Sequence, residues 1–166
     1  MPSNVLERTR MNRNLAAALQ VLTMLVGLGA LAFLLWEPHV EGRNAHATLF
    51  QIYFHDPFLA YAYTGSIAFF TALYQVFRLL GYVAAHDVLS SRSVKALQSL
   101  KRCALTLIAF LMGAEAYLHF IQRAKGEDIA GGVMIGLVLM VASGGVAIAA
   151  AVLERSLRMA VQQRSA

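Results

Sequence analysis

The chain has 166 residues, of which 58% are hydrophobic and only 14% are charged, and its mean hydropathy is +0.59. Soluble domains carry about 25% charged residues, so this composition excludes an ordinary water-soluble domain and favours a helical bundle in lipid. The net charge of +5 comes from residues that lie between the apolar blocks, without interleaved aromatics, so nucleic acid is not expected as a partner.

The first apolar segment, residues 15–36, contains no charged side chain and follows a polar start that carries Arg8, Arg10 and Arg13. A helix over these residues would be about 33 Å long, which is enough to cross ~30 Å of hydrocarbon. The apolar run is longer than that of a signal peptide, so we expect a retained membrane helix. Pro38 is expected to end this helix, because proline removes a backbone donor.

The first loop, residues 37–57, gathers histidines and acidic side chains. Imidazole and carboxylate groups suit zinc or copper, and four residues of the loop are candidate ligands on the outer face: His39, His46, His55 and Asp56. No close metal-binding motif such as H-E-x-x-H occurs, and histidines of an exposed loop can equally be solvated. The identity of any metal stays open, and no cofactor is expected.

The second apolar segment, residues 58–77, is followed by a basic stretch, residues 78–102. Ser90 or Ser91 is a plausible helix cap there. Beyond the cap, one side of a helical wheel carries Val94, Leu97 and Leu100, and the other side carries Arg92, Lys95 and Arg102. This basic face could contact anionic lipid headgroups or a cytoplasmic protein, or it could serve only to orient the chain.

The third apolar segment, residues 103–121, carries Glu115 and His119, which are spaced i, i+4 on one helix face. Ionisable groups within a membrane span are costly, and they suggest function. Three interpretations stay open: a hydrogen-bonded polar pair that faces the bundle, a proton-linked or pH-sensing pair, and part of a metal site. A short amphipathic cytoplasmic helix is expected to lead into this span, without an intervening break.

The last apolar segment, residues 129–153, is rich in glycine. Gly132 and Gly136 form a G-x-x-x-G pair, which lets a neighbouring helix approach closely and so predicts tight helix packing. The tail from residue 154 is expected to extend this helix. The lone cysteine, Cys103, excludes an internal disulfide and is expected to pack at a helix end.

The distribution of Lys and Arg predicts the orientation. Eleven of them lie in the N-terminus, the central basic stretch and the tail, whereas the two other loops hold only three. In short loops this bias sets topology, so we expect both termini and the central stretch in the cytoplasm of a bacterial cell membrane.

From Phe70 onward the chain resembles the YoaS-like family of uncharacterised bacterial membrane proteins. The resemblance rests on the runs FFTALYQVFRLLGYV, SVKALQSLKRCAL and GVMIGLVLMVASGGVAIAAAVLERSLRMA, whereas the first span and first loop match only in hydropathy. It implies four membrane helices and a bacterial cytoplasmic membrane, with no known activity and no catalytic residues. Members are often encoded beside a small helix-turn-helix regulator, which hints at sensing or regulation.

We therefore predict an all-α polytopic membrane protein, a four-transmembrane-helix bundle that forms one membrane domain over residues 1–166. No nucleophile elbow, phosphate loop or paired intramembrane carboxylates occur, so we expect no enzyme. The leading functional hypothesis is a non-enzymatic accessory, sensory or regulatory protein that acts through helix packing and a cytoplasmic partner. The alternative is a small ion- or proton-coupled transporter, or a metal-responsive protein, that uses Glu115 and His119. The expected partners are the lipid bilayer and either a second copy of the chain or a membrane or cytoplasmic protein.

Overall fold

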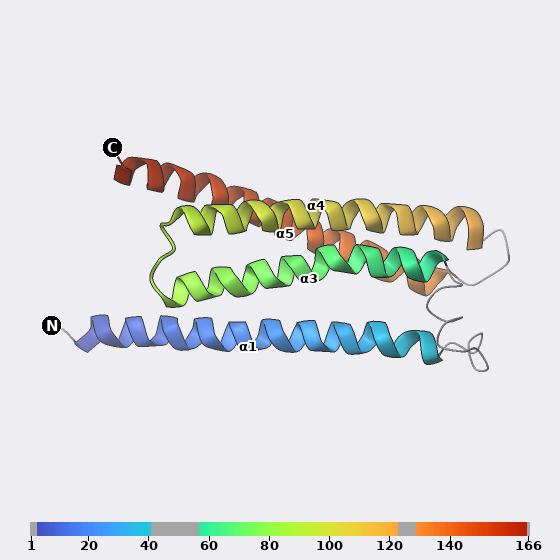
Figure 1. The fold of residues 1–166 in the computed structure, drawn as a ribbon, viewed down its shortest axis with the longest axis horizontal. Helices are drawn as coiled ribbons and strands as arrows, with labels where there is room; N and C mark the ends of the chain where they lie inside the picture. The colour runs from blue at the N-terminus through green and yellow to red at the C-terminus, as the bar shows by residue number, and fades with distance from the viewer. Residues whose placement is uncertain (1–2, 41–56, 123–128, 166) are drawn as a thin grey trace.

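The computed structural model describes residues 3–40, 57–122 and 129–165, and the regular secondary structure of these ranges consists of helices (Figure 1). The elements are α1 (Ser3–Val40), α3 (Pro57–Ala84), α4 (Ser91–Tyr117), the π-helical turn η2 (Leu118–Gln122) and α5 (Ala130–Ser165). Four helices are long and apolar enough to cross a membrane. The predicted fold class, an all-α membrane protein with four spans, is confirmed.

Consecutive long helices run antiparallel, and Figure 1 shows the start of α1, the turn from α3 to α4 and the end of α5 at one end of the molecule. We call this the basic end, and the opposite end, where α1 stops and α5 starts, the loop end. Helix α4 packs against both α3 and α5, whereas α1 packs mainly on α3. The helices therefore follow the order α1, α3, α4, α5 in space.

The helices extend past the apolar segments at the basic end. Helix α3 continues to Ala84, α4 already starts at Ser91, and α5 runs to Ser165. The amphipathic stretch before the third span is the first part of α4 and is continuous with that span. Hydropathy drops at the first charged residue, but Arg, Lys, Leu and Gln are good helix formers, so the helix itself does not stop there.

Pro38 does not end the first helix, contrary to the sequence prediction, because α1 continues to Val40. Proline at position 38 cannot donate a hydrogen bond to the carbonyl of Leu34, four residues earlier. The structure supplies another donor, since the Tyr63 hydroxyl of α3 donates to Leu34 O at 2.7 Å. The acceptor freed by proline is thus satisfied from the neighbouring helix.

The turn between α3 and α4 is closed by its own hydrogen bonds. His86 takes a left-handed conformation with φ of 56°. Its amide donates to Val83 O at 3.1 Å, and the Asp87 amide donates to Tyr82 O at 2.9 Å, which is the Schellman pattern of helix termination. Ser90, one of the two caps that the sequence suggested, then caps α4 by accepting from the Ser93 amide.

The core lies in the half of the bundle nearer the basic end, between three helices. It comprises Leu97 and Leu100 of α4 and Ala150 of α5, with partly buried side chains around them: Ala72, Val76, Leu79 and Leu157. The apolar face predicted for residues 94–100 is therefore the buried face of α4. Most large apolar side chains of α1 remain exposed, as expected for a helix that faces lipid on most of its circumference.

Candidate functional site

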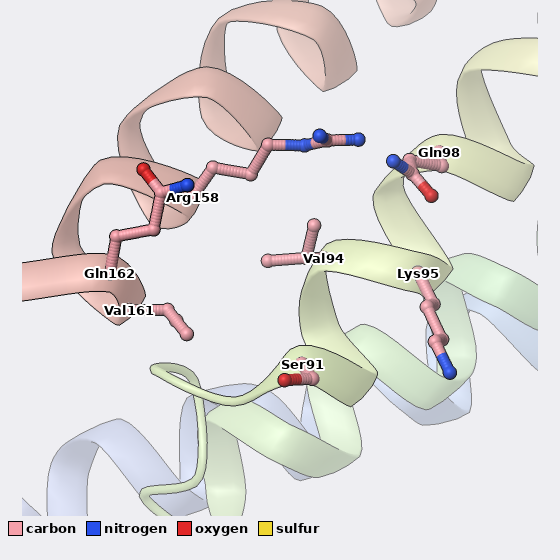
Figure 2. Close-up of a pocket in the computed structure, with 7 residues that line it drawn as sticks. All are labelled: Ser91, Val94, Lys95, Gln98, Arg158, Val161 and Gln162. Atoms are coloured by element: carbon pink, nitrogen blue, oxygen red, sulfur yellow. The ribbon is translucent and has the colours of Figure 1, made fainter. Parts of the chain in front are cut away.

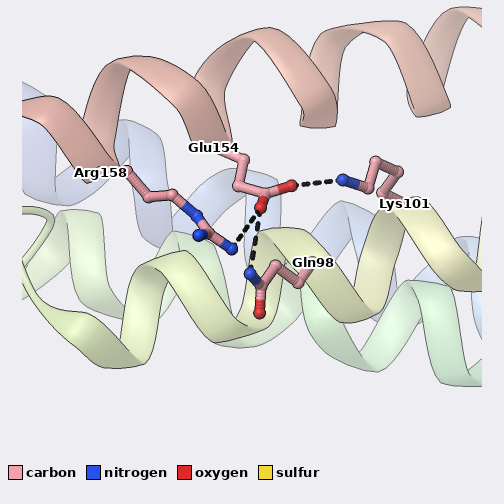
Figure 3. Close-up of polar contacts among 4 residues, drawn as sticks. All are labelled: Gln98, Lys101, Glu154 and Arg158. Atoms are coloured by element: carbon pink, nitrogen blue, oxygen red, sulfur yellow. Dashed lines mark hydrogen bonds and ion pairs between the residues drawn. The ribbon is translucent and has the colours of Figure 1, made fainter.

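At the basic end, three side chains converge on the carboxylate of Glu154, where α4 and α5 cross (Figure 3). Lys101 Nζ lies 2.6 Å from Glu154 Oε2, and Arg158 Nη2 lies 2.9 Å from Oε1. Gln98 Nε2 also donates to Oε1, at 3.0 Å. Two donors come from α4 and one from α5, so the cluster ties the two helices together.

Burial of the Glu154 carboxylate strengthens its interactions with the surrounding donors. Glu154 is only 6% exposed, whereas the Lys101 and Arg158 side chains remain 33% and 53% exposed. A buried carboxylate is costly unless it is paired and hydrogen-bonded, and here both oxygens accept from charged donors. The two cations keep contact with solvent, which lowers their own desolvation penalty. The arrangement holds charge and fixes geometry, and it offers no nucleophile or proton relay.

Sequence reasoning did not single out Glu154 as a site residue. One signal was available: Glu154 and Arg158 are spaced i, i+4, which places them on one face of a helix. The contact with Lys101 joins residues 53 positions apart, and no periodicity reveals it. Lys101 entered the sequence analysis through the positive charge that orients the chain and through the family resemblance.

The predicted basic face is present at the same end. Arg92, Lys95 and Arg102 are exposed on α4, and none of them belongs to the Glu154 cluster. Beside them, a hollow of about 270 Å³ opens between α4 and α5 (Figure 2). It is lined by Ser91, Val94, Lys95, Gln98, Arg158, Val161 and Gln162. Figure 2 shows Arg158 reaching across from α5 toward Gln98 of α4.

The G-x-x-x-G pair of α5 packs against α4 near the loop end. The Glu115 carboxylate lies directly over Gly136, where a β-carbon would collide with Oε1. A β-carbon at Gly132 would lie 3.1 Å from Leu118 Cδ1, which is also too close for ordinary contact. The pair thus serves α4–α5 packing within one chain, and the absence of a side chain at Gly136 makes room for Glu115.

His119 is placed differently from Glu115. It lies in η2, beyond the end of α4, where it is exposed and its ring meets Phe120 edge-on at 5.8 Å between centroids. Among the described residues, no hydrogen bond or ion pair joins Glu115 to His119. A π-helical turn shifts the side chains that follow it relative to an α-helix, so the i, i+4 spacing no longer guarantees a shared face.

The metal hypothesis rests on parts of the chain that are not described. The side chains of His39, His46, His55 and Asp56 lie outside the described residues. Within the described side chains, no group of three His, Cys, Asp or Glu residues could hold a metal ion. The outer-face ligand set therefore stays a prediction.

Two further polar contacts connect α3 to α4. Tyr61 donates to Phe110 O at 2.9 Å near the loop end, and Gln75 Nε2 donates to Ser99 Oγ at 3.1 Å nearer the basic end. Gln75 Oε1 is buried and has no hydrogen-bond partner among the described residues. In the second span, polar side chains thus contact other helices at Tyr61, Tyr63 and Gln75.

Comparisons with known proteins agree with this picture and widen the sequence resemblance. Residues 11–165 match the family described as "Protein of unknown function (DUF2975)". The chain is also similar to the "Uncharacterized membrane protein YoaS" of Bacillus subtilis (strain 168), with 34% identity over 156 residues, which cover 93% of this chain and 96% of the relative. No solved structure matches. The similarity therefore reaches into α1, further than the motifs after Phe70 indicated.

Proposed function

The chain belongs to the DUF2975 family of membrane proteins, and from this premise we propose that it is a non-enzymatic accessory or sensory protein that acts through the basic end of α4 and α5. A cytoplasmic protein partner docks on the basic face, Arg92, Lys95 and Arg102. The bundle transmits a signal to that partner or anchors it at the membrane, and it performs no chemistry on a substrate.

The observation that carries this proposal is that the cations of the basic end fall into two groups, those paired with Glu154 and those exposed on the basic face. Lys101 and Arg158 both pair with Glu154, which offsets one of their two charges, so these two cations maintain the α4–α5 contact. The cations of the basic face are exposed and stand beside the hollow between the helices. A rigid helix end that presents unneutralised cations suits an acidic partner surface, because complementary charge speeds and directs association.

The proposal requires the basic end to lie in the cytoplasm of a bacterial cell. The excess of Lys and Arg at that end supports this orientation. Reporter fusions at residues 45, 90 and 166 test it. We expect cytoplasmic signals at 90 and 166 and an external signal at 45, and an external signal at 90 would contradict the orientation.

Crosslinked co-purification followed by mass spectrometry tests the partner. We expect the triple reversal of Arg92, Lys95 and Arg102 to Glu to abolish recovery of a cytoplasmic protein that wild type recovers. The matched control is Arg155→Glu, which reverses an exposed cation on α5. Equal recovery by the triple variant and wild type, at equal membrane abundance, would contradict the proposal.

A second function, ion or proton coupling, is favoured by one specific observation. Glu115 is a half-buried carboxylate in the third apolar segment, held against Gly136, and no described residue donates a hydrogen bond to it. An ionisable group in such a place marks an ion or proton path in many membrane proteins.

Matched substitutions separate the two functions. Glu115→Gln keeps the shape of the side chain and removes its charge, and His119→Ala removes the exposed imidazole. If both variants, at normal abundance, show the same phenotype as deletion of the protein, coupling is favoured. If Glu115→Gln has no phenotype and the basic-face variant no longer recovers the partner, the accessory function is favoured.

A further inference from the structure

The surface between α1 and α3 contains an apolar groove that is separate from the α4–α5 end. Its volume is about 310 Å³, and it is lined by Thr23, Met24, Gly27, Phe70, Leu73, Tyr74 and Phe77. The polar side-chain groups of this lining are two hydroxyls, and that of Thr23 already donates to Leu19 O at 2.8 Å. The groove therefore suits hydrocarbon.

A cation is held where the groove approaches the basic end. Arg78 follows the groove residues on α3, and its guanidinium carbon lies 5.7 Å from the ring centroids of both Tyr74 and Tyr82. Arg78 Nη2 donates to the Tyr82 hydroxyl at 2.6 Å. Two cation–π contacts and a hydrogen bond fix the orientation of the guanidinium. No described carboxylate pairs with it.

Tyr74 connects the two features. It lines the groove, its ring lies near the Arg78 guanidinium, and the residue is 57% exposed. A molecule that lies in the groove with its polar end toward the basic end thus meets Arg78 first. Guanidinium binds phosphate oxygens well because its donors form a planar fork.

We propose that this groove and Arg78 form a binding site for one anionic phospholipid, with an acyl chain between α1 and α3 and the phosphodiester on the Arg78 guanidinium. The site neither requires nor excludes the partner proposed above, since it uses other helices.

Charge favours a lipid over a second copy of the chain. The basic end carries most of the Lys and Arg residues, so a parallel second copy would bring further cations, such as Arg13, toward Arg78. Free phosphate would satisfy Arg78 but would leave the apolar groove unfilled. A lipid with a negative headgroup matches both parts of the site.

Binding of phosphatidylglycerol and phosphatidylcholine with identical acyl chains tests the site, measured by native mass spectrometry on the delipidated full chain in neutral detergent. For wild type we expect one phosphatidylglycerol to bind about fivefold more tightly than phosphatidylcholine, the effect of one cation at a lipid surface. Arg78→Gln should remove this preference, and Arg155→Gln, which changes an exposed cation on α5, should retain it.

The groove has its own matched variants. A β-carbon at Gly27 meets Leu73 Cδ1 at an ordinary 3.5 Å, whereas Gly29 has nothing within 4 Å. Gly27→Leu should therefore fill the groove and weaken both lipids about tenfold, roughly the loss of two buried methylenes. Gly29→Leu should bind as wild type does. Met24→Trp narrows the same groove from a position that is 56% exposed, so it gives a second test that leaves the α1–α3 contact in place.

Three results would overturn the proposal. One is an unchanged preference for phosphatidylglycerol in Arg78→Gln. Another is wild-type lipid affinity in both Gly27→Leu and Met24→Trp. The third is displacement of phosphatidylglycerol by inorganic phosphate, which would show that the acyl chain contributes nothing. If Gly27→Leu changes the mass from dimer to monomer and leaves lipid binding intact, a second copy occupies the groove and the lipid proposal is wrong.

Discussion

The interface between α4 and α5 is built differently at its two ends. At the basic end, the carboxylate of Glu154 accepts from Gln98, Lys101 and Arg158. Toward the loop end, Gly132 and Gly136 let α4 approach, and the carboxylate of Glu115 rests on Gly136 with no described donor. One end of the interface is held by charge, and the other by close packing of small residues.

This difference separates two roles that acidic residues play in one pair of helices. A carboxylate with a full set of donors is a structural element, since its removal leaves cations without a partner. A carboxylate that only fills space beside a glycine contributes little to stability. The basic end should therefore respond strongly to loss of its acid, and the loop end to loss of its glycine.

The largest expected effect is that of Glu154→Ala. Loss of a buried acid that pairs two cations costs about 3–5 kcal/mol, and partial exposure of Lys101 and Arg158 reduces this to about 3 kcal/mol. Reversible unfolding of the purified protein in mixed detergent micelles measures the change in free energy. The control Arg155→Ala, at an exposed position, should stay within about 0.5 kcal/mol of wild type.

A double variant tests whether charge is the cause. In Glu154→Leu with Lys101→Met, the less exposed of the two unpaired cations is replaced by an apolar side chain, and Arg158 keeps its contact with solvent, so most of the stability should return. If Glu154→Ala unfolds like wild type, the basic end is not held by this cluster and the comparison fails.

The second largest effect is expected for Gly136→Leu at the other end of the interface. A side chain at this position meets the Glu115 carboxylate, and overpacking of this kind costs about 2 kcal/mol. The matched control is Gly145→Leu on the same helix, where nothing lies within 4 Å of the added carbon. The same unfolding measurement applies to both.

The identity of the obstructing group can also be tested. Glu115→Ala removes the side chain that the new leucine would meet, so it should restore part of the stability of Gly136→Leu. Equal destabilisation by Gly136→Leu and Gly145→Leu would show that α5 tolerates no leucine in general, and that the glycine pair has no special contact.

The features that could be predicted from the sequence are those set by local pattern. Four long apolar segments predicted four spans, because a chain in lipid must satisfy its backbone within helices. The buried side of residues 94–100 and the cap at Ser90 also followed from local pattern. Such features depend on neighbours along the chain, and periodicity reports them directly.

The remaining features depend on which helices meet. The Lys101–Glu154 contact spans 53 positions, and the donor that lets α1 continue past Pro38 comes from Tyr63, 29 positions after Leu34. Neither contact has a local signature. Glu115 and His119 looked like one unit by spacing, but η2 follows Glu115, and α-helical periodicity does not hold through a π-turn.

A smaller effect should come from Tyr63→Phe, which removes the hydroxyl that replaces the donor missing at Pro38. The Leu34 carbonyl then loses its partner, at a cost of about 1 kcal/mol. Trp36 is the only tryptophan and lies half a turn beyond Leu34, so its fluorescence reports this part of α1 during unfolding.

The proline provides the control for this prediction. Pro38→Ala restores the amide that can donate to Leu34 O, so Tyr63→Phe should cost less in that background than in wild type. An unchanged cost would show that the tyrosine acts through packing and not as a substitute donor. The test thus measures how the loop end compensates for a missing hydrogen bond.

The smallest effect is a gain, expected for His86→Gly in the turn at the basic end. The left-handed conformation of His86 costs an ordinary residue about 1–2 kcal/mol, and glycine avoids this cost. Glycine also gives the unfolded chain more freedom, which costs about 0.4–1 kcal/mol. The first effect is larger, so the net gain in the free energy of unfolding should be about 0.5 kcal/mol.

His86→Ala and His86→Val calibrate that balance, because alanine keeps the conformational cost and a β-branched side chain increases it. Stability should therefore fall in the order Gly, His, Ala, Val.

The turn is closed by backbone bonds from His86 and Asp87 to the end of α3, and the contacts of Glu115 with Gly136 lie far along the helices from it. The gain of His86→Gly should accordingly add to the loss of Gly136→Leu without coupling, since distant sites are independent. A non-zero coupling free energy between the two substitutions would mean that the helices shift as rigid rods. The two ends of the bundle would then not respond separately.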